Sequence, residues 1–234
     1  MSQQMEKLRQ KALELGADGI EFDVHLSADG VPVVVHDFRV DDTTDGHGRV
    51  AEMTLAQIRE LDAGSSFDPA FAGERIPTLE EVLETFGERL LLNIELKYLG
   101  LRDNGLERAV IAQVERRGLG GRVIFSSFNP FALRRAARLA PHIPVGLLYA
   151  PDMPLPLRRA WLAPLCPHQA RHPEHSMVDA RYMAWARRRG YHVNTWTVDD
   201  PDEMRRLIGL GVDSIITNTP DVLRLVLETQ GHGA

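Results

Sequence analysis

The feature of this sequence that most constrains its fold is a regular alternation of short apolar runs with segments of helical periodicity. After residue 90, the two kinds of segment follow one another with only short turns between them. Such an alternation is typical of parallel strands joined by helical crossovers. We predict strands near residues 19, 91, 123, 145, 168, 193 and 214, and helices near 103–117, 130–139, 156–163, 177–189, 201–210 and 220–229.

The chain before residue 90 contains a helix, a hairpin and an irregular stretch. Residues 4–15 have helical spacing and run directly into the strand at 19–24. Asp29-Gly30 predicts a tight turn into a returning strand at 31–35. Residues 38–78 have loop composition with one short helix at 54–61, and Thr78 and Glu81 then have the spacing of a capping box.

An eight-stranded β/α barrel begins with a strand, whereas this chain is predicted to begin with a helix. Apart from the returning strand of the hairpin, seven strands are predicted. The fold class is therefore α/β, and it is either a TIM-type (β/α) barrel that lacks its first strand or an open sheet. The 234 residues suit one large domain or two small ones.

Two of the predicted strands carry acidic side chains between apolar ones. Glu21 and Asp23 share one face of the first strand, and Asn93, Glu95 and Lys97 share one face of the strand at 91–97. Carboxylates in an apolar strand are costly unless something compensates them. A solvated edge strand or a buried ion pair would explain one such strand, but two of them favour a functional site.

Function in β/α barrels sits at the carboxyl ends of the strands, where these side chains lie. Carboxylates of Glu21, Asp23 and Glu95 converging in one mouth would bind a hard cation, Ca²⁺ or Mg²⁺. Lys97 beside them favours an anionic substrate. His36, at the end of the hairpin strand, suits proton transfer at a phosphate.

The composition limits the classes of molecule that this chain is expected to bind. The net charge is −6 and no basic block stands out, so neither nucleic acid nor an anionic membrane surface is expected as a partner. The single cysteine, Cys166, excludes a disulfide framework and a cysteine-based zinc site. No apolar run is long enough to span a bilayer, and the N-terminus lacks the apolar core of a signal peptide. We therefore expect a cytoplasmic location and no integral membrane segment.

The sequence resembles the glycerophosphodiester phosphodiesterase family along nearly its whole length and in the same order. Characteristic segments are Gly19-Ile20-Glu21-Phe22-Asp23, Asn93-Ile94-Glu95-Leu96-Lys97 and Trp196-Thr197-Val198. Each segment alone is weak evidence, and together they are strong. The matching residues are 16–24, 29–37, 43–48, 76–83, 93–97, 126–129, 172–173, 196–198 and 211–217.

The resemblance implies one barrel domain over residues 1–234, with a small insertion at about 38–78 after the second strand. It implies hydrolysis of small-molecule glycerophosphodiesters to an alcohol and glycerol 3-phosphate. It also implies a divalent metal, Ca²⁺ or Mg²⁺, held by Glu21, Asp23 and Glu95. In this scheme a hydroxyl of the substrate's own glycerol attacks first, and water opens the resulting cyclic phosphate.

The resemblance also implies roles for single residues. His36 and Glu95 are predicted to be catalytic. Lys97 matches a contact to the substrate phosphate, Trp196 matches a wall of the substrate pocket, and His172 is predicted to line that pocket. Without the resemblance, Trp196 would be read as a core residue.

The sequence departs from the family at its start. The family opens with a strand carrying His-Arg-Gly and then Pro-Glu-Asn-Thr at the first helix, whereas Ser2-Gln3-Gln4-Met5 stands where the proline motif would fall. Three explanations remain open. The chain is a shortened form, or it is a divergent member that closes the gap with another segment or as a homodimer across the open edge, or it is a relic with little catalysis that still binds metal or phosphate.

His25 is a further candidate because it shares the strand face of Glu21 and Asp23. We expect its side chain to lie past the rim in solvent, where it could act as a substitute base only by reaching back into the mouth.

Overall fold

The structure is a computed structural model that describes residues 11–65 and 67–231. Its centre is one sheet in the order β2-β1-β3-β4-β5-β6-β7-β8, in which all neighbours are parallel except the hairpin of β1 and β2. All seven strands predicted from the alternation are present, and so is the returning strand. The strands are β1 (Gly19–Leu26), β2 (Pro32–Val34), β3 (Leu91–Leu96), β4 (Val123–Ser127), β5 (Val145–Tyr149), β6 (Ala170–Pro173), β7 (His192–Thr195) and β8 (Ser214–Ile215).

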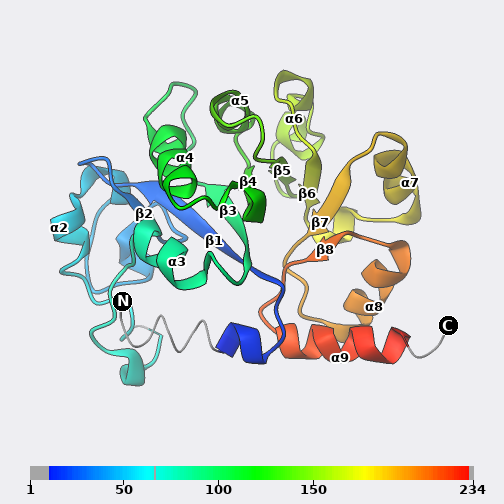
Figure 1. The fold of residues 1–234 in the computed structure, drawn as a ribbon, viewed down its shortest axis with the longest axis horizontal. Coiled ribbons are helices and arrows are strands. Elements are labelled where there is room, and N and C mark those ends of the chain that lie inside the picture. The colour runs from blue at the N-terminus through cyan, green and yellow to red at the C-terminus, as the bar shows by residue number, and fades with distance from the viewer. Residues whose placement is uncertain (1–10, 66, 232–234) are drawn as a thin grey trace.

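Helices surround the curled sheet on its outer side, as the ribbon shows (Figure 1). This arrangement confirms the predicted TIM-type β/α fold. The helices are α2 (Leu55–Ile58), α3 (Leu79–Phe86), α4 (Leu106–Arg116), α5 (Pro130–Leu139), α6 (Leu155–Arg158), α7 (Ala180–Arg188), α8 (Pro201–Leu210) and α9 (Pro220–Gly231). Residues 11–14 are also helical and lie beside α9, and the rest of the helix expected at 4–15 falls largely outside the described residues.

The alternation of side chains along β1 and β3 separates the core from the mouth of the barrel. Phe22 and Val24 from β1 and Ile94 and Leu96 from β3 pack outward into the main hydrophobic core, which α3, α4 and α5 complete. The acidic residues of both strands therefore face inward. Burial of this apolar side fixes the register, because a slip by one residue would turn the carboxylates into the core.

The segment between β2 and α3 has a small core of its own. Val40, Val50, Ile58 and Ile76 from this segment pack against Val33 and Val35 of the hairpin. Its end is fixed by Thr78, whose hydroxyl accepts from the backbone N–H of Glu81 while the Glu81 carboxylate accepts from the backbone N–H of Thr78. This reciprocal pair is the predicted capping box.

Among the described residues, β8 at one end of the sheet does not pair with β1, which is the second strand from the other end. Within residues 11–65 and 67–231, β8 pairs only with β7, and β1 pairs only with β2 and β3. A cavity of about 1140 Å³ lies there, lined by the first residues of β1 and β3 and by residues 214–218. Among the described helices, none combines the length and the apolar character that a bilayer crossing requires.

Candidate metal and phosphate site

The three predicted metal ligands come together on the inner face of β1 and β3, with Glu95 next to last in β3, Asp23 opposite it and Glu21 third in β1. Parallel pairing places Asp23 directly opposite Glu95, and Glu21 opposite Asn93. One carboxylate oxygen from each of Glu21, Asp23 and Glu95 lies within 4.8 Å of the other two. Adjacent parallel strands with acids on the same face therefore build the cluster without help from any loop.

Lys97 links two of these acids. Its Nζ lies 3.0 Å from Oδ1 of Asp23 and 2.9 Å from Oε1 of Glu95. The three side chains are largely buried, with 12% of Lys97, 12% of Asp23 and 8% of Glu95 exposed. Lys97 reaches this position because its backbone N–H donates to the carbonyl of Val24, which extends the β1–β3 ladder past the end of β3.

The electrostatics of the mouth reflect crowded, partly desolvated carboxylates. Desolvation raises the pKa of Glu95, Lys97 opposes that shift, and Asp23 adds to it. Desolvation within the mouth and repulsion from Asp23 and Glu95 raise the pKa of Glu21 to about 8, although part of this residue is open to solvent. Desolvation by itself would lower the pKa of Lys97, but Glu95 and Asp23 outweigh it and the pKa rises. One lysine thus leaves the negative charge only partly compensated.

This donor set fits a hard divalent cation. The cluster offers carboxylate oxygens only, it is partly dehydrated, and it keeps an open side at Glu21. Oxygen-only coordination is what Ca²⁺ and Mg²⁺ prefer. Among the described residues, this is the single group of three or more acidic, histidine or cysteine side chains with such spacing.

His36 lies at the rim, just after β2. Its Nδ1 is 2.8 Å from Oδ1 of Asp37, and 71% of its side chain is exposed. The hairpin holds it next to the cluster, since the N–H of Val35 donates to the carbonyl of Asp23. Its catalytic role stays a prediction.

The expectation that His25 lies in solvent was wrong. Only 3% of His25 is exposed, because the ring packs edge to face against Phe38 at 4.9 Å between centroids. Its Nε2 lies 3.3 Å from the backbone carbonyl of His36. His25 therefore supports the rim segment that carries His36. The sequence could have indicated the contact between His25 and His36, because the predicted hairpin places the two strands that carry them side by side.

An aromatic wall closes another side of the mouth. Trp196 follows β7 and meets Phe128, which follows β4, edge to face at 5.6 Å between centroids. The indole Nε1–H of Trp196 donates to the backbone carbonyl of His172 at 2.9 Å. Sequence reasoning gave Phe128 no role, since an aromatic residue after a strand is usually part of a core.

His172 lies deeper than a rim position. Its side chain is fully buried, and its Nε2 faces the amide nitrogen of Asn194 at 3.0 Å. Its Nδ1, the hydroxyl of Ser126 and the amide oxygen of Asn93 are buried without a hydrogen-bond partner among the described residues. Such atoms are normally satisfied by water or ligand, so the inner face of the barrel beneath the carboxylates is polar.

Comparison with known proteins agrees with this geometry. The sequence model of the "Glycerophosphoryl diester phosphodiesterase family" matches residues 8–222. A glycerophosphodiester phosphodiesterase of Caldanaerobacter subterraneus is 42% identical over 214 residues, which are 91% of this chain and 87% of that protein.

Two solved structures extend the likeness to three dimensions. A phosphodiesterase of Oleispira antarctica in complex with its product sn-glycerol-3-phosphate has a TM-score of 0.83 and 29% identity, covering 95% of this chain and 90% of its own. A putative glycerophosphoryl diester phosphodiesterase of Silicibacter pomeroyi has a TM-score of 0.80 and 30% identity. The match covers 95% of this chain and 87% of that protein's chain.

Proposed function

This chain belongs to the glycerophosphoryl diester phosphodiesterase family, and we propose that it hydrolyses glycerophosphodiesters to an alcohol and glycerol 3-phosphate. The observation that carries the proposal is the meeting of Glu21, Asp23 and Glu95 around Lys97 at one end of the barrel. This arrangement combines a cation site with a residue that can bind a phosphate. The product held by the Oleispira protein is in keeping with the same product here.

We propose that Glu21, Asp23 and Glu95 hold a divalent ion, either Ca²⁺ or Mg²⁺. When bound, the ion supplies positive charge that stabilises the charge building on the phosphoryl oxygens. Lys97 adds a second positive charge from the protein and orients a phosphoryl oxygen at the floor of the mouth. Separate titrations with the two ions, followed by activity and by thermal unfolding, decide between them.

His36 is proposed to accept the proton of the attacking glycerol hydroxyl, since it is the histidine at the rim whose side chain is open to a substrate. The hydroxyl oxygen bonds to phosphorus as the bond from phosphorus to the alcohol oxygen breaks, and the departing alkoxide takes a proton from water. A water molecule then opens the cyclic phosphate, and the glycerol oxygen that is released takes back the proton held by His36. Trp196 and Phe128 are proposed to pack against the glycerol moiety and to exclude water from it. His172 contributes through its backbone carbonyl, which accepts from the indole Nε1–H of Trp196 and so positions that ring.

The experiment is a release assay for glycerol 3-phosphate from glycerophosphocholine, with and without EDTA. Asp23→Asn and Glu95→Gln should each lower kcat/KM by about 100-fold or more, as the loss of one charge-stabilising group typically does. Glu88→Gln, which removes an exposed carboxylate outside the mouth, is the matched control and should leave activity unchanged. Activity that survives EDTA and both substitutions would refute the proposal.

The alternative predicted from the sequence, a relic that binds metal or phosphate without turnover, is not favoured. The acids and the lysine remain assembled, and the relative from Caldanaerobacter subterraneus, which matches 91% of the chain, carries the name of the enzyme. The same assay tests the alternative, because a relic would bind Ca²⁺ or Mg²⁺ in calorimetry yet release no glycerol 3-phosphate.

Three statements about the whole chain remain proposals. We infer one barrel domain over residues 1–234, a cytoplasmic location, and a homodimer across the open edge between β8 and β1. Unpaired strand edges support the dimer, because they tend to recruit another chain. Light scattering over a range of concentrations tests the dimer, cooperative calorimetric unfolding tests the single domain, and cell fractionation tests the location.

A further inference from the structure

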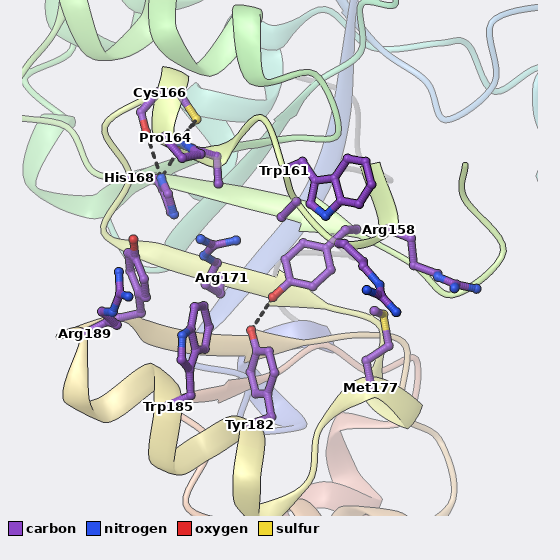
Figure 2. Close-up of a pocket in the computed structure, with 15 residues that line it drawn as sticks. Arg158, Trp161, Pro164, Cys166, His168, Arg171, Met177, Tyr182, Trp185 and Arg189 are labelled. Atoms are coloured by element: carbon purple, nitrogen blue, oxygen red, sulfur yellow. Dashed lines mark hydrogen bonds between the residues drawn. The ribbon is translucent and has the colours of Figure 1, made fainter. Parts of the chain in front are cut away.

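A second cavity lies far from the carboxylate cluster, on the outer face of β6. It has a volume of about 720 Å³, which is in the usual range for a small-molecule site. Residues of α6, of α7 and of the segments after them line it, and Figure 2 shows their side chains converging from both sides of the strand. The side chains of β6 alternate between the two faces of the strand, so His172 points into the barrel and Arg171 points into this cavity.

Arg171 is a buried cation without a carboxylate partner. Only 6% of it is exposed, and none of the ion pairs formed by the described residues includes it. Its Nε is buried without a hydrogen-bond partner in the described part of the chain. Within residues 11–65 and 67–231, no aspartate or glutamate lines the cavity. A desolvated charge that lacks a counter-ion is costly, so such residues are normally paired.

Aromatic rings provide part of the compensation. The Arg171 guanidinium carbon lies 4.8 Å from the ring centre of Tyr191, 5.3 Å from Trp185 and 5.9 Å from Tyr149. Figure 2 shows Arg171 in the middle of the cavity, with His168 on one side of it and Trp185 and Tyr182 on the other. Rings stabilise a cation through their faces but leave its net charge in place. An anion would remove that charge.

The rest of the lining also favours an anion with an apolar body. Arg158, Arg159 and Arg189 stand around the cavity. The Nε2 of His168 is buried without a hydrogen-bond partner among the residues that the structure describes, while its Nδ1 is 2.9 Å from the carbonyl of Cys166. The walls are formed by aromatic and sulfur-containing side chains, among them Trp161, Trp185, Tyr149, Tyr182, Tyr191 and Met177.

We propose that this cavity is a second ligand site, separate from the catalytic mouth, for a small organic oxyanion with an aromatic or otherwise apolar body. Arg171 binds the phosphate or carboxylate group, for which the planar guanidinium is suited. Arg189 and the two arginines of the α6 region attract the anion at the rim. The tryptophan and tyrosine rings hold the apolar body.

The three tryptophans of the chain allow a direct test. Trp161 and Trp185 line the cavity, whereas Trp196 stands at the mouth. In a Trp196→Phe variant, fluorescence therefore reports on the cavity. Titration with phenyl phosphate should give a saturable change that inorganic phosphate or phenol alone gives only at far higher concentration.

Arg171→Met, which removes the charge but keeps a long side chain, should weaken phenyl phosphate binding by about tenfold or more. Arg189→Gln should weaken it by about twofold, and Arg188→Gln, its exposed neighbour outside the cavity, should leave it unchanged. If Arg171→Met does not fold, the comparison of Arg189→Gln with Arg188→Gln still tests the proposal, and equal binding by these two variants would contradict it. Lys97→Met should not affect the signal.

The proposal is overturned if phenyl phosphate gives no saturable change. It is also overturned if the change persists at full affinity in folded Arg171→Met, since Arg171 would then be a purely structural cation. Loss of the signal in a Lys97→Met variant that is still folded would likewise overturn it, because the probe would then be binding at the mouth.

Discussion

At the scale of single residues, Lys97 contacts two of the acids that are proposed to bind the metal. Lys97→Met should therefore lower the stability of the metal-free protein, since it leaves Asp23 and Glu95 buried side by side without a cation. The expected loss is on the order of 3 kcal/mol in the free energy of unfolding. Added Mg²⁺ or Ca²⁺ should raise the Tm of the variant by more than it raises the Tm of the wild type.

Thermal unfolding with EDTA and with each ion measures this effect. Arg138→Met, which removes an exposed cation from the end of α5, is the control and should change neither Tm nor its dependence on metal. Equal metal-free stability of Lys97→Met and wild type would show that the lysine does not balance the acids.

A second prediction at this scale concerns His36. As the proposed proton acceptor, it should be needed for turnover but not for metal binding, because 71% of its side chain is exposed and it is not one of the three acids proposed to hold the ion. His36→Asn should lower kcat by about 10²–10⁴ while the affinity for Mg²⁺ or Ca²⁺ stays the same. His47→Asn, which alters an exposed loop histidine, serves as the control. A His36→Asn enzyme with normal kcat would place the proton acceptor elsewhere.

At the scale of elements, the close approach of β5 and β6 explains why position 146 is a glycine. Gly146 in β5 faces His172 in β6, and an added Cβ would overlap the buried imidazole ring. Gly146→Ala should therefore destabilise the protein by about 1–3 kcal/mol, as overpacking of a core typically does. Chemical denaturation measures the change.

Gly209→Ala in α8 is the matched control for this prediction. A Cβ at Gly209 meets no atom within 4 Å, and alanine favours a helix interior over glycine by about 0.5–1 kcal/mol. The same chemical change should thus have opposite signs at the two positions. A neutral Gly146→Ala variant would mean that the His172 ring moves aside at little cost.

The elements were predictable where local chemistry decides them. The spacing of Thr78 and Glu81 in the sequence is enough to predict their capping box, which the structure contains. The helix expected at 156–163 shows the limit, because α6 ends at Arg158 and the chain turns at Ala160, whose φ of 49° lies in the left-handed region. A separate 3-10 turn then runs from Ala163 to Leu165, with Pro164 in its middle. Periodicity gave no sign of that break, since an alanine ordinarily continues a helix.

At the scale of the whole molecule, the predictable part of the site is the part that lies on strands. Register alone brings Asp23 against Glu95, so the cluster followed from the sequence once the two strands were taken as parallel neighbours. The contact of Phe128 with Trp196 and the burial of His25 depend on how loops fold over the mouth. The Arg171 cavity depends on helix packing around β6, and no local signal in the sequence indicates it.

The stability of the whole chain should depend on pH through His172. Burial lowers the pKa of this histidine to about 3 in the folded state, whereas an unfolded histidine titrates near 6.5. Above pH 6.5 both states leave it neutral, and below that pH only the unfolded state binds the proton. Folding therefore loses stability as the pH falls from about 6.5 toward 3. The loss between pH 7 and pH 5 is about 2 kcal/mol from this one group.

His172→Gln isolates that contribution, because all other titrating groups are common to both proteins. Urea unfolding at pH 7 and pH 5 should show a fall in the free energy of unfolding that is about 2 kcal/mol smaller in the variant than in the wild type. The comparison uses the change with pH, so a constant penalty for placing glutamine opposite Asn194 cancels. Parallel pH dependences would mean that the buried imidazole takes up its proton in the folded protein, and the polar interior beneath the carboxylates would then be accessible to water.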